Sequence, residues 1–104
     1  MVTTGRRRTR VDPTRPADQA EALAATRRIV ARLKLEILGD EDALPGVFTD
    51  EDRELLRGDT AERRRDDLRV FAAWHAALGT DPDAALDEMR ERTYERVMGR
   101  LGGA

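Results

Sequence analysis

The sequence predicts an all-α protein: a small bundle of three long helices and one short helix, preceded by a flexible basic N-terminal arm. Apolar residues recur at helical spacing in three long segments, and glycine or proline separates these segments. No segment shows the alternating pattern of a half-buried strand. With 104 residues the chain is one small domain at most. We therefore assign residues 1–15 to the arm and residues 16–104 to a single helical domain.

The first long helix is expected to run from about Pro16 to Leu38. Proline is favoured in a first helical turn, and Gly39 is the expected terminator. Because apolar residues lie on two sides of this helix, we expect it to be buried against several neighbours. The two apolar rows are Leu23, Ile29, Val30, Leu33 and Ile37, and Ala24, Ala31, Leu35 and Leu38.

A loop over residues 40–48 and a short helix follow. Leu44, Val47 and Phe48 flank the Pro45-Gly46 turn and are expected to attach the loop to the core. Thr49 and Asp52 have the spacing of a capping box, which predicts a helix from about Asp50 to Arg57.

The third helix is expected over Thr60–Leu78, with Asp59 and Glu62 as its cap pair. Its first half is charged, whereas residues 70–78 are apolar nearly all round and are the most core-like segment of the chain. The fourth helix begins at Asp81-Pro82, and its apolar stripe reaches Leu101.

The predicted helices carry more apolar surface than an isolated bundle needs. Residues 17–104 hold 23 apolar residues larger than alanine, and two helices are apolar on two faces. This surplus favours contact with another chain, as a homodimer or with a larger protein partner; the alternative is a compact monomer that covers these residues itself. The candidate interface residues are Leu35, Leu38, Val70, Trp74, Tyr94 and Met98.

The near-neutral total charge is the sum of a basic N-terminal segment and an acidic remainder. Residues 1–16 carry five arginines against one aspartate, whereas residues 17–104 carry 14 basic and 20 acidic residues. A solvated tail is one interpretation of the arm; contact with nucleic-acid phosphates or with an acidic protein surface are the others. The arginines that could make such contacts are Arg6, Arg7, Arg8 and Arg10 in the arm and Arg63, Arg64 and Arg65 in the third helix.

The short helix, Gly58 and the third helix also have lengths compatible with a helix-turn-helix. Charged residues, however, occupy the positions around the turn that should be apolar. Asp66 and Asp67 would also face the phosphates.

Independent catalysis is not expected. The chain has no cysteine and no serine, and His75 is its single histidine, which we interpret as a core or interface residue. The acidic runs match no calcium loop, so we expect no metal site. With no cysteine or serine nucleophile and one histidine, we also expect no cofactor and no enzymatic activity. No apolar run is long enough to cross a membrane, and the lack of cysteine favours the cytoplasm.

The function expected from these observations is that of a small helical interaction protein: an accessory subunit, adaptor or inhibitor. The alternatives are a DNA-binding regulator or antitoxin-like protein that uses the basic arm, and a non-catalytic helical subunit of a multi-chain enzyme. The abundance of arginine over lysine, with many alanines, is typical of a GC-rich bacterial or phage genome.

Overall fold

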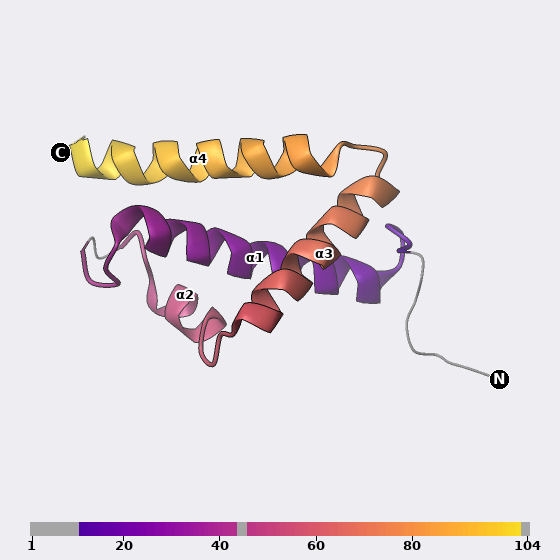
Figure 1. Cartoon of the computed structure of the whole chain (residues 1–104), viewed down its shortest axis with the longest axis horizontal. Coiled ribbons are helices and arrows are strands. Elements are labelled where there is room, and N and C mark those ends of the chain that lie inside the picture. Colours follow the sequence, from indigo (N-terminus) through magenta and orange to yellow (C-terminus); the bar gives the residue numbers. More distant parts are fainter. Residues whose placement is uncertain (1–10, 44–45, 103–104) are drawn as a thin grey trace.

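A computed structural model describes residues 11–43 and 46–102, and it confirms the all-α class. Its four helices are the regular elements of these two ranges (Figure 1). Residues 1–10, with four of the arginines assigned to the arm, lie outside the described ranges. The helices are α1 (Pro16–Leu38), α2 (Asp50–Leu55), α3 (Ala61–Ala77) and α4 (Pro82–Gly102).

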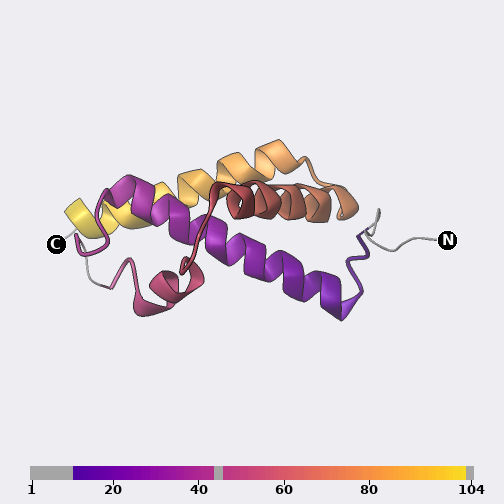
Figure 2. The ribbon, with the colours of Figure 1, turned by 60° about the horizontal axis from the view of Figure 1, so that its bottom comes forward.

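Helix α1 is the central element. It packs against α2, α3 and α4, and α3 and α4 also pack against each other. Helices α1 and α4 run in the same direction, with α2 on the side of α1 away from α4 (Figures 1 and 2). Helix α3 crosses α1 and leads back to the start of α4, so it does not cover the C-terminal halves of α1 and α4 (Figure 1).

The ends of α1 and α2 follow the predicted local chemistry. Gly39 adopts a left-handed conformation with φ of 78°, and its N–H donates to the carbonyl of Leu35 at 2.7 Å. The predicted capping box is confirmed: the Thr49 hydroxyl accepts from the N–H of Asp52, whose carboxylate accepts from the N–H of Thr49.

Two boundary predictions were wrong. Helix α2 ends at Leu55 rather than at Arg57, because the N–H of Arg57 bonds the carbonyl of Glu54 in a tighter turn. The N-cap of α3 is Thr60, whose hydroxyl accepts from the N–H of Arg63 at 3.0 Å. Asp59 does not cap the helix because its carboxylate is held by arginine side chains instead.

The apolar core is small and rich in alanine. Alanine at three core positions of α1 allows a close approach of the neighbouring helices. The predicted row that begins at Leu23 is wrong at that residue, which is 52% exposed, because the buried seam passes through Ala22 and Ala25. The buried apolar residues are Ala22, Ala25, Ile29, Ala31, Val47, Phe48, Phe71 and Val97.

The segment 70–78 is less buried than expected. Phe71 is 3% exposed, but Trp74 is half-buried and Leu78 is 48% exposed. Within the described ranges no second layer covers the outer side of α3, so its alanine-rich end faces outward. Val47 and Phe48, by contrast, are buried as predicted, and Leu44 lies outside the described ranges.

Residues 11–15, which we assigned to the arm, form a turn that bonds to the start of α1. The N–H of Asp12 donates to the Asp18 carboxylate at 2.9 Å, and the Gln19 side-chain amide donates to the carbonyl of Pro13 at 2.8 Å. Asp18 is 3% exposed, so this turn is attached to a buried acceptor.

Candidate functional site

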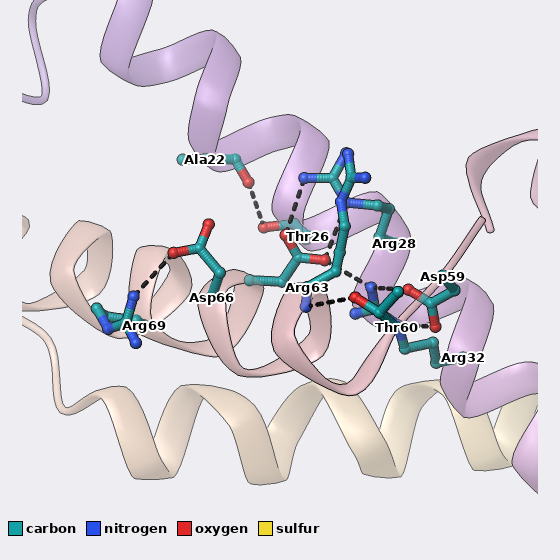
Figure 3. Close-up of polar contacts among 10 residues, drawn as sticks. Ala22, Thr26, Arg28, Arg32, Asp59, Thr60, Arg63, Asp66 and Arg69 are labelled. Atoms are coloured by element: carbon teal, nitrogen blue, oxygen red, sulfur yellow. Dashed lines mark hydrogen bonds and ion pairs between the residues drawn. The ribbon is translucent and has the colours of Figure 1, made fainter. Parts of the chain in front are cut away.

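A network of arginine–aspartate pairs connects α1 to α3 and to the turn that precedes α3 (Figure 3). Arg28 donates two parallel hydrogen bonds to the Asp67 carboxylate, from Nε at 2.9 Å and from Nη2 at 2.8 Å. Arg32, one turn later, donates from Nη2 to Asp67 at 2.7 Å and binds Asp59 through Nε and Nη2 at 3.1 and 2.7 Å. Such two-pronged pairs fix the rotation and register of the two helices.

The electrostatics of this network favour the charged state of both partners. Burial alone raises the pKa of Asp67, but its hydrogen bonds with Arg28 and Arg32 outweigh burial and lower the pKa. The Asp59 pKa falls to about 2, chiefly because of the hydrogen bond from Arg32, with a further contribution from Arg64. The carboxylates are thus ionised at neutral pH and bound on several sides, an arrangement that suits a structural role rather than proton transfer.

A smaller cluster attaches α2 to α1. Lys34 of α1 donates to the Asp52 carboxylate at 2.9 Å, and that carboxylate also closes the capping box with Thr49. Both charged side chains are nearly buried. Among the described residues every buried side-chain nitrogen or oxygen has a hydrogen-bond partner, so neither cluster contains an unsatisfied buried polar group.

An apolar groove follows α1 and α4. We call it the α1–α4 groove. Its deeper part is a recess of about 410 Å³ between α1, the start of α3 and the start of α4, with Ile29, Leu33, Leu35, Leu56, Leu68 and Leu86 as its apolar lining. Its shallower part continues along the same two helices and is lined by Leu33, Ile37 and Tyr94.

An exposed apolar stripe on α4 extends from this groove toward the C-terminus. Tyr94, Met98 and Leu101 are spaced at i, i+4 and i+7, so they share one side of the helix. They are 53%, 39% and 50% exposed. Large side chains left so exposed beside an apolar recess are typical of a surface that another molecule covers.

The predicted interface residues divide between this surface and partly packed positions. Leu35 and Tyr94 line the α1–α4 groove, and Met98 belongs to the stripe beside it. Leu38, Val70 and Trp74 are half-buried and do not line it. Leu56, Leu68 and Leu86 also line the recess, and the sequence does not single them out because their convergence depends on the crossing of three helices.

The arginines of α3 separate into two kinds. Arg63 and Arg65 have no carboxylate within ion-pair distance among the described residues, and they lie with Arg28 and Arg69 around a shallow polar hollow. Arg64 instead binds Asp59 at 3.0 Å and faces the recess. The arm arginines Arg6, Arg7, Arg8 and Arg10 lie outside the described residues.

The helix-turn-helix interpretation finds no support in this arrangement. Helix α2 has six residues and packs on α1, not on α3, so the two helices do not form the paired unit that presents a recognition helix. Asp67 is buried in the ion-pair network rather than facing outward.

His75 is half-buried and has ordinary structural contacts. Its ring lies 4.4 Å from the Phe71 ring, and Nδ1 is 3.1 Å from the Thr80 hydroxyl. No group of three or more His, Cys, Asp or Glu residues suited to a metal ion occurs in residues 11–43 and 46–102. In the same ranges, no helix has the length and hydropathy of a membrane span.

Comparison of the chain with protein-family models, with curated proteins and with solved structures gives no match in any of the three.

Proposed function

We propose that the protein is a small helical interaction module that binds another protein through the α1–α4 groove. The observation that supports this function is the apolar recess together with Tyr94, Met98 and Leu101 exposed beside it. The cost of leaving this surface in water is removed when a partner covers it.

The shape of the site suits a helical ligand. The groove follows two helices that run in the same direction, and α3 covers them over only part of their length (Figure 1). A further helix placed there would complete the layer that α3 leaves unfinished, and helices commonly bind such grooves through apolar residues spaced at i, i+4 and i+7.

A second candidate function is contact with nucleic-acid phosphates through α3. The observation that favours it is the pair of exposed arginines, Arg63 and Arg65, that lack a carboxylate partner among the described residues. A filter-binding assay with duplex DNA tests it: replacing both arginines by glutamine should weaken binding and reduce its salt dependence. Binding with an unchanged salt slope contradicts this candidate.

Affinity capture from the native host with matched variants tests the proposed interaction function. We expect wild-type protein and Leu78→Ser to retain the same partner, because Leu78 is exposed at the α3–α4 turn and does not line the groove. Tyr94→Ser combined with Leu33→Ser should lose it. Equal capture by all three proteins contradicts the assignment of the groove.

A further inference from the structure

We infer that the occupant of the α1–α4 groove is an amphipathic helix with basic flanks from a different protein, and not a second copy of this chain. This inference rests on the proposed function and specifies its ligand. It follows from the charges that remain around the groove once each ion pair has been matched.

Most charged groups at the groove already have partners. Arg32 and Arg64 both bind Asp59, and Arg32 also binds Asp67. Arg90 lies 3.7 Å from Asp87, one turn away on α4. The arginines near the apolar lining are therefore neutralised by aspartates of the same surface.

Two carboxylates at the groove remain without an opposite charge among the described residues. Glu36 projects from α1 and Glu91 from α4, and both are exposed and line the shallower part of the groove with Leu33 and Tyr94. Because one lies on each wall, a helix placed between the walls would have a carboxylate along both of its sides. Lysine or arginine on the two flanks of that helix would complement them.

The same charges disfavour a second copy of the chain. Its most accessible apolar helix is the stripe of α4, and in that helix Glu91 and Glu95 each precede a stripe residue, Tyr94 or Met98, by three positions. These glutamates would enter the groove beside Tyr94 and Met98 and meet Glu36 and Glu91 of the first copy. Like charges placed together in an interface exclude the wrong partner.

A displayed library of 18-residue helices tests the inference on the full-length chain. Each helix carries leucine at i, i+4, i+7 and i+11, and its flanking positions vary among Lys, Arg, Glu, Gln and Ser. We expect selection to enrich Lys and Arg on both flanks, with lysine-flanked helices binding about tenfold more tightly than glutamate-flanked ones, as two rim pairs predict.

Two charge-matched variants locate the effect. Glu36→Gln with Glu91→Gln should remove the preference for basic flanks, whereas Glu21→Gln with Glu51→Gln should retain it, since these exposed glutamates lie outside the groove. Selected helices without basic enrichment, or the same preference in both variants, overturn the inference and leave the proposed function standing.

Two further outcomes separate the inference from the proposed function. A stable dimer in sedimentation that Tyr94→Ser with Leu33→Ser dissociates would overturn the inference, because the second copy would then be the occupant. If the wild type retains no helix of the library above the level that the Tyr94→Ser, Leu33→Ser variant retains, the proposed function and the inference are both overturned.

Discussion

The two sides of α1 are stabilised in contrasting ways. Toward α3, Arg28 and Arg32 both bind the buried carboxylate of Asp67, and every buried side-chain nitrogen or oxygen among the described residues has a hydrogen-bond partner. Toward α4, the C-terminal half of the same helix contributes Leu33 and Ile37 to an open groove. The contrast indicates that directional charge pairs fix the packing of α1 and α3, while part of the apolar surface of α1 and α4 stays exposed.

This division has a physical reason. A buried ion pair adds little net stability compared with apolar packing, but it imposes one geometry and is costly to break from one side only. Apolar contacts are non-directional, so an apolar groove can accept a ligand without imposing a single geometry. The α1–α3 contact should therefore be sensitive to single substitutions, and the groove should not.

The largest expected effect comes from Asp67→Ala. It leaves Arg28 and Arg32 without their shared buried carboxylate, and loss of one partner from such a network costs about 3–5 kcal/mol of unfolding free energy. Urea unfolding monitored by circular dichroism measures this loss of unfolding free energy. The neighbouring Asp66→Ala removes an exposed pair with Arg69 and should cost less than about 1 kcal/mol; equal losses would contradict the contrast.

Acid should weaken the same side of the molecule. The pKa values of Asp52, Asp59 and Asp67 lie below the ordinary aspartate value in the folded state, so the unfolded state binds more protons as the pH falls. Their stabilisation is complete above about pH 5 and is lost progressively as the pH falls toward 2.

The shift of Asp59 from 3.8 to about 2 corresponds to about 2 kcal/mol of this stabilisation. Thermal unfolding between pH 5 and 2 measures the loss. Asp59→Asn should flatten that dependence, and an unchanged slope would contradict the role of Asp59.

The capping residues should produce a smaller and graded effect. Thr49→Ala and Thr60→Ala each remove a hydroxyl that accepts a backbone N–H, at a cost of about 1 kcal/mol. Thr49→Ala should cost more, because Asp52 also binds Lys34 and connects α2 to α1. The unfolding free energies of the two variants test this order, and a larger loss for Thr60→Ala would contradict the role of Asp52 in connecting α2 to α1.

The smallest effect on stability should come from the exposed stripe. Tyr94→Ser with Met98→Gln removes side chains that are 53% and 39% exposed, so the unfolding free energy should change by no more than about 0.5 kcal/mol per substitution. A loss of several kcal/mol would mean that these residues stabilise the isolated fold.

The sequence was a sufficient guide where local chemistry decides the structure. The Pro16–Leu38 helix, the Thr49–Asp52 capping box and the burial of Val47 and Phe48 all follow from neighbouring residues and are confirmed. These features depend on spacings of a few positions, which a sequence displays directly.

Features set by helix crossing were not predictable in this way. Asp67 looked like an exposed acid in a charged segment, and its pairing with Arg28 depends on the meeting of residues 39 positions apart. Leu23 and Leu86 look alike in a helical pattern, yet one is 52% exposed and the other lines the recess. Only the rotation of each helix separates them, and the buried charges help to set that rotation.

Site-specific photo-crosslinking in the native host tests the central claim most directly. A benzophenone amino acid replaces Tyr94 beside the groove or, as a control, Leu78 at the α3–α4 turn, since both positions are about half exposed. The account predicts a discrete crosslink to one other protein from position 94 and none from position 78. The same crosslinks from both positions, or a crosslink from position 78 alone, would contradict it.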